Sequence, residues 1–172
     1  MEEIINKVAK SPLISLDLED YLSKEQIMVF DIALGLFEGI ILKEKDFRRF
    51  LDEMDWSIYV GKNVGIICSA DAIIPIWAYM LIVTYLEPVA NVVTQGDAGE
   101  VEKAVIDQAV ERLVTDQDLQ DAKVVIKGCG AVNNKEYAYS KITLALVSKV
   151  TRLMYGEPCS VVPVFKKRRQ PR

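Results

Sequence analysis

The 172-residue chain contains no histidine, and this absence limits the chemistry open to it. Histidine is the usual general base near neutral pH, so catalytic triads of the Ser-His-Asp and Cys-His types are excluded. Metal sites that need an imidazole ligand are excluded for the same reason. Any reaction or metal binding would therefore use carboxylates, thiols, hydroxyls, lysine or the backbone.

Signals for disulfides, secretion and membrane insertion are also lacking. The three cysteines, Cys68, Cys129 and Cys159, are an odd number at wide spacing and do not form a disulfide framework. The longest uncharged run, residues 72–86, is shorter than the roughly 18 apolar residues that indicate a membrane span. The acidic start Met1-Glu2-Glu3 differs from the basic start of a secretory signal. We therefore expect a cytoplasmic protein without a membrane partner, whose thiols are free or metal-bound.

What the chain does contain is enough apolar surface for a packed core. Hydrophobic residues make up 51% of the sequence and the net charge is only −4, which excludes a disordered chain. Short β-branched runs alternate with longer helical periods, a pattern typical of βαβ units. We predict an α/β fold in which residues 1–165 form a single three-layer domain, with a mostly parallel sheet flanked by helices.

Individual elements follow from the spacing of the apolar residues. Helical spacing predicts helices over residues 1–10, 43–55, 72–86, 99–114 and 137–154. Ser69 or Asp71 is the predicted N-cap of the third helix, and Gly156 the predicted C-terminal cap of the last. Apolar runs predict strands or extended segments over residues 14–18, 27–30, 64–68, 90–94, 123–126 and 160–165, with the first at an edge and the third central and covered on both faces.

The cysteines lie where the predicted elements begin or end. In an open α/β sheet, ligands bind beyond the carboxyl ends of the strands, and Asp31, Cys68 and Cys129 all follow predicted strands. A helix N-terminus just after Cys68 would favour its thiolate form. Glycines flank Cys129, and Cys159 follows a Glu-Pro pair.

Three interpretations of these thiols stay open on spacing alone, since no CxxC pair marks a metal site. In the first, the three thiolates bind zinc or an iron–sulfur cluster, with Asp71 or Glu157 as a further ligand. In the second, Cys68 is the nucleophile of a thiol enzyme or a persulfide carrier. In the third, the cysteines are small buried hydrophobic residues of a non-catalytic interaction module.

The C-terminal residues 166–172 carry five positive charges. Such a tail can bind an acidic partner, but it is typical of a disordered, solubilising end, and this is what we expect. No RNA-binding fingerprint accompanies it, so we expect no nucleic-acid partner. The sequence leaves open a homo-oligomer.

Several motifs resemble an uncharacterised bacterial family, the domain of unknown function 2480. The resemblance covers nearly the whole chain, although Ala131-Val132-Asn133-Asn134 replaces an expected proline-containing loop. It implies a gene neighbourhood of iron–sulfur cluster assembly components, and hence partners among those proteins. Together with the thiol positions, it favours a cytoplasmic metal- or iron–sulfur-binding accessory protein, with Cys68, Cys129 and Cys159 as ligands. The motifs that carry the resemblance are CSADAIIP at 68–75, WAY at 77–79, KGC at 127–129, YGEPCS at 155–160, ILKEKDFR at 41–48 and DW at 55–56.

Overall fold

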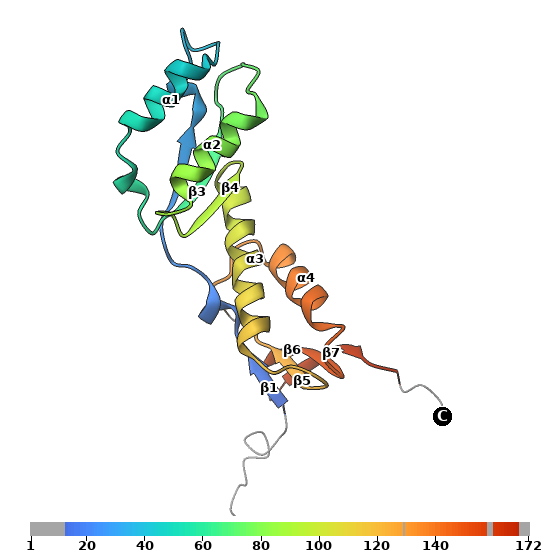
Figure 1. The fold of residues 1–172 in the computed structure, drawn as a ribbon. Coiled ribbons are helices and arrows are strands. Elements are labelled where there is room, and N and C mark those ends of the chain that lie inside the picture. The colour runs from blue at the N-terminus through green and yellow to red at the C-terminus, as the bar shows by residue number, and fades with distance from the viewer. Residues whose placement is uncertain (1–12, 129, 158–159, 169–172) are drawn as a thin grey trace, which may run out of the picture. The chain divides into compact units, whose positions relative to one another are not determined.

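The computed structural model describes residues 13–128, 130–157 and 160–168 (Figure 1). Contacts divide the chain into two compact units, a central unit of residues 23–105 and a terminal unit of residues 1–22 and 106–172. The predicted α/β class is confirmed, but the strands form two mostly parallel sheets instead of one. Strand β1 pairs with β5, which lies far along the chain. The strands that come between them in the sequence, β2, β3 and β4, pair with one another and form the second sheet. The prediction of one domain stays a prediction, because contacts do not measure whether the units unfold together.

The central unit is a parallel sheet, in the order β2-β3-β4, with a single apolar core. The predicted central strand is confirmed: the first four residues of β3 are buried, as expected for a strand covered on both faces. Phe47 of α1 and Ile82 of α2 pack with Phe30 of β2 in this core. The elements are β2 (Ile27–Asp31), η2 (Ile32–Gly35), α1 (Glu44–Glu53), η3 (Trp56–Tyr59), β3 (Asn63–Ile67), α2 (Ile76–Leu86) and β4 (Val92–Gln95).

The terminal unit has a four-stranded sheet in the order β1-β5-β6-β7. Strands β1, β5 and β6 are parallel and β7 is antiparallel, and the predicted edge strand is confirmed as β1. One core joins Val124 and Leu153 of the sheet to Leu113 and Ile142 of the helices. The elements are β1 (Leu13–Leu16), η1 (Leu18–Tyr21), α3 (Ala98–Asp116), which begins within the central unit, β5 (Lys123–Ile126), α4 (Lys135–Leu146), β6 (Arg152–Glu157) and β7 (Ser160–Lys166).

The predicted helix over residues 137–154 is wrong in its second half. Helix α4 ends at Leu146, and the chain returns as β6, which pairs with β5. The β-branched pair Val150 and Thr151 favours an extended backbone at this point. Gly156 is not a helix cap: it lies in β6 with φ of 122°, where a Cβ would meet the backbone oxygen of Ser160 at 2.6 Å. The glycine therefore permits the close β6–β7 hairpin.

The predicted start of the buried helix is also wrong. Helix α2 begins at Ile76, with Pro75 as its N-cap residue and no side-chain cap bond, so neither Ser69 nor Asp71 caps it. A proline disfavours the helical conformation of the residue before it, which delays the helix start. The prediction of a helix over residues 1–10 lies outside the described residues.

Candidate functional site

Cys68 directly follows the central strand β3 of the central unit. Its side chain is half-buried and packs against the apolar core, and its Sγ donates a weak hydrogen bond to the carbonyl of Ala70 at 3.5 Å. The helix N-terminus predicted just after Cys68 is not found there, because α2 begins eight residues later. Cys68 is a free thiol.

Asp31, at the carboxyl end of the neighbouring strand β2, is fully engaged in hydrogen bonds. Its carboxylate accepts bonds from the hydroxyl of Ser69 at 2.5 Å, the amide of Ser69 at 3.0 Å and the amide of Ala33 at 3.0 Å. Partial burial raises the pKa of Asp31, but these bonds to the ionised form outweigh it and hold the pKa below its usual value. Asp31 therefore binds the loop after β3 through Ser69. Asp71, in the same loop, is exposed.

The carboxyl ends of β5 and β6 form a second place where polar groups gather. Ile126, the last residue of β5, lies opposite Tyr155 of β6, so Lys127-Gly128 and the last two residues of β6, Gly156 and Glu157, lie at the same edge of the sheet. Gly128 is pressed against the Tyr155 ring, since a Cβ there would meet the phenolic oxygen at 2.5 Å. Cys129 and Cys159 follow these segments and lie outside the described residues.

Two carboxylates that the sequence reasoning missed lie at this edge. Glu19 Oε2 accepts a hydrogen bond from the amide of Ala131 at 2.9 Å, and Asp17 pairs with Lys127 at 3.5 Å. Both follow β1, which ends beside β5. The rule that parallel strands end at one edge could have identified them, had the pairing of β1 with β5 been known.

The structure thus places the described candidate ligands in different units. Cys68 and Asp71 belong to the central unit and Glu157 to the terminal unit. Across residues 13–128, 130–157 and 160–168, no group of three or more cysteine, aspartate or glutamate side chains is arranged to hold a metal ion. Since two of the three thiols lie outside these ranges, the cysteine site stays a prediction.

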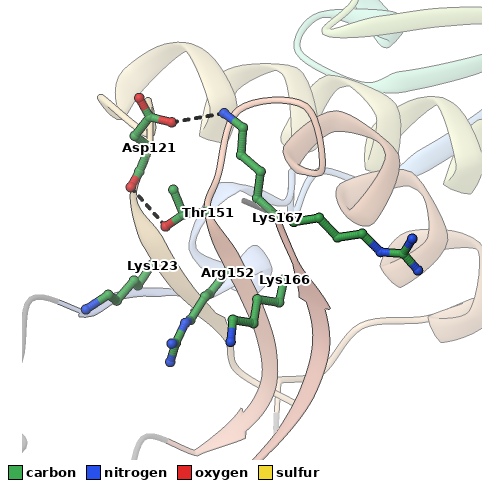
Figure 2. A pocket seen from close by; sticks show the side chains of 7 residues that line it. Asp121, Lys123, Thr151, Arg152, Lys166 and Lys167 are labelled. Atoms are coloured by element: carbon green, nitrogen blue, oxygen red, sulfur yellow. Dashed lines mark hydrogen bonds and ion pairs between the residues drawn. The ribbon is translucent and has the colours of Figure 1, made fainter. Parts of the chain in front are cut away.

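At the opposite edge of the same sheet, the terminal unit has a hollow of about 1380 Å³ (Figure 2). It lies where β5 and β6 begin and β7 ends. Lys166, expected in a disordered tail, is the last residue of β7, and the backbone amide of Lys167 donates to Thr151 O at 2.9 Å. Five of the seven described lining residues are cations: the lining includes Asp121, Lys123, Thr151, Arg152, Lys166, Lys167 and Arg168.

Comparison with other proteins gives a family and no activity. No helix in the described part of the chain is long and apolar enough to cross a membrane. Neither the curated proteins nor the solved structures contain a match to the chain. The family model described as "Protein of unknown function (DUF2480)" matches residues 2–167. The chain therefore belongs to the DUF2480 family, as its cysteine-bearing motifs predicted.

Proposed function

We propose that this protein is a cytoplasmic accessory protein that binds zinc or an iron–sulfur cluster through Cys68, Cys129 and Cys159, and that it serves cluster assembly. Asp71 and Glu157 are the proposed oxygen ligands. Thiolates are the preferred ligands of both metals, and a site of sulfur and oxygen needs no histidine.

One observation supports the part of this proposal that concerns Cys129 and Cys159. Strands β5 and β6 are direct parallel neighbours, so the described residues before Cys129 and Cys159 lie at one edge of the sheet. Gly128 precedes the first of these cysteines and Glu157 comes two residues before the second. Asp17 and Glu19 add carboxylate oxygens at this edge, through their contacts with Lys127 and Ala131.

The test is metal analysis of the full chain, purified without chelator both in air and anaerobically. We expect close to one zinc ion or one cluster per chain, lost in each of the variants Cys68→Ser, Cys129→Ser and Cys159→Ser. Because thiolates must deprotonate to bind metal, we also expect proton release when zinc is added to the apo protein.

Carboxylate variants sharpen this test. Asp71→Asn and Glu157→Gln should weaken metal binding, whereas Asp118→Asn, a change at an exposed turn residue, should not. A metal content near zero that is the same in the wild type and the three cysteine variants would contradict the proposal and favour the interaction module with structural cysteines. Full metal retention in Cys68→Ser alone would remove Cys68 from the ligand set.

A further inference from the structure

Three cations stand in one row across the sheet of the terminal unit. Lys123 of β5 lies directly opposite Arg152 of β6, and Arg152 lies directly opposite Lys166 of β7. Residues opposite one another in neighbouring strands share a face of the sheet. Figure 2 shows the three side chains extending to the same side, and all three are exposed.

This row has no described counter-charge. Like charges directly opposite one another destabilise a sheet, so three in succession are unfavourable unless an anion offsets them. The carboxylate that lines the hollow, Asp121, pairs with Lys167 at 3.3 Å. None of the described ion pairs involves Lys123, Arg152, Lys166 or Arg168.

We propose that the hollow binds a small ligand that carries two phosphate groups. Each phosphate monoester has a charge of about −1.5 to −2 at neutral pH, so two of them match the four cations without a described partner. The row spans about 10 Å, two strand spacings of about 4.8 Å, which is more than one phosphate can bridge. Arg152, at the centre, supplies a planar fork for bidentate contact with phosphate, while Lys123 and Lys166 act as point charges.

The lining also argues against a nucleic-acid strand or an apolar ligand. None of the described lining residues is aromatic, so among them bases would have nothing to stack on. The lining that the structure describes contains no aliphatic residue either. Recognition therefore rests on charge and hydrogen bonds, as suits a compact, strongly anionic molecule.

Isothermal titration calorimetry on the full chain tests the proposal, with fructose 1,6-bisphosphate and inorganic tripolyphosphate as probes. We expect both probes to bind, fructose 6-phosphate to bind at least about tenfold more weakly, and all affinities to fall as salt rises. The Cys68→Ser, Cys129→Ser, Cys159→Ser triple variant should bind these probes like the wild type. The phosphate site can thus fail or hold independently of the proposed metal site.

Variants at the row give the sharper measurement. Arg152→Gln should weaken bisphosphate binding at least about tenfold. Lys135→Gln, which removes the same charge from the start of α4, should leave binding unchanged. Asp121→Asn should strengthen binding, because it frees Lys167 from its ion pair. Asparagine tolerates the left-handed backbone that Asp121 adopts at φ of 56°, so this variant should fold.

Three outcomes would overturn the proposal. The first is no binding of either probe to the wild type, and the second is equal weakening by Arg152→Gln and Lys135→Gln. The third is binding of citrate or of a single-stranded RNA oligomer with an affinity equal to or higher than that of the bisphosphate. Circular dichroism of each variant distinguishes lost binding from lost folding.

Discussion

Asp31 shows how one carboxylate fixes two loops at the edge of the central sheet. It accepts hydrogen bonds from the Ser69 hydroxyl and amide and from the Ala33 amide. Because the pKa of Asp31 is lowered in the folded state, its ionised form contributes stability above its unfolded pKa of about 4. That contribution is lost as the pH falls through the lower folded pKa.

We expect Asp31→Asn to reduce the free energy of unfolding by about 1 kcal/mol at neutral pH, since charge-assisted hydrogen bonds are lost. The difference from the wild type should shrink at acidic pH, as the pH falls through the lowered pKa of folded Asp31 and the carboxylate becomes protonated. Urea denaturation across this pH range measures both effects. Asp116→Asn, at an exposed residue that is not a proposed metal ligand, is the control and should change stability by less than about 0.5 kcal/mol. A difference that grows towards low pH would contradict this account.

The row of cations crosses three strands, β5, β6 and β7. Repulsion between these cations should lower the free energy of unfolding of the terminal unit. Replacing Arg152 by glutamate turns two like-charge cross-strand pairs, with Lys123 and Lys166, into opposite-charge pairs. We expect Arg152→Glu to raise the free energy of unfolding of the ligand-free protein by about 0.5 to 1 kcal/mol. The same variant should lose phosphate binding, so stability and binding change in opposite directions.

Salt provides the control for this prediction. The rise in the free energy of unfolding of Arg152→Glu should be present at about 0.01 M salt. It should be largely absent at about 1 M, where the Debye length is about 3 Å. Lys24→Glu, a charge reversal of an exposed residue in the central unit, should change stability by less than about 0.5 kcal/mol. An Arg152→Glu variant less stable than the wild type at low salt would show that the row does not repel.

At the scale of the whole molecule, the described residues form two cores, yet one helix contributes to both units. The unit boundary falls within α3: Val101 packs close to Gly65 of β3, and Leu113 lies in the core of the terminal unit. Helix formation is cooperative, so we expect the two units to unfold together. Both tryptophans, Trp56 and Trp77, lie in the central unit, so their fluorescence reports on that unit.

We predict that Leu153→Ala, a cavity in the terminal core, will shift the tryptophan transition in urea as well as the circular dichroism transition. Leu153 is fully buried, so the change should cost about 2 to 5 kcal/mol. Coincident transitions would support one cooperative domain. A tryptophan transition unmoved by Leu153→Ala would show two independent domains and contradict the sequence-based prediction of one.

Features set by local spacing could be predicted from the sequence, whereas features set by the pairing of distant strands could not. Residues 142, 146, 150 and 153 repeat at helical spacing, and all four are fully buried, yet the last two are not helical. Periodicity therefore identified which side chains enter the core, but β6 forms because β5 offers its backbone groups as partners. Pro75 was visible in the sequence, and its effect on the start of α2 could have been predicted from local chemistry.

Local apolar spacing and composition were enough to establish the α/β class, most of the strands and the absence of imidazole chemistry, because these depend on residues close together in the chain. The pairing of β1 with β5, the division of the strands into two sheets, and the contacts of Asp17 with Lys127 and of Glu19 with Ala131 became visible in the folded structure alone. The folded structure also decided that Lys123, Arg152 and Lys166 form one row. Strand pairing joins residues far apart in the chain, and the spacing of residues along one segment carries no record of its partner.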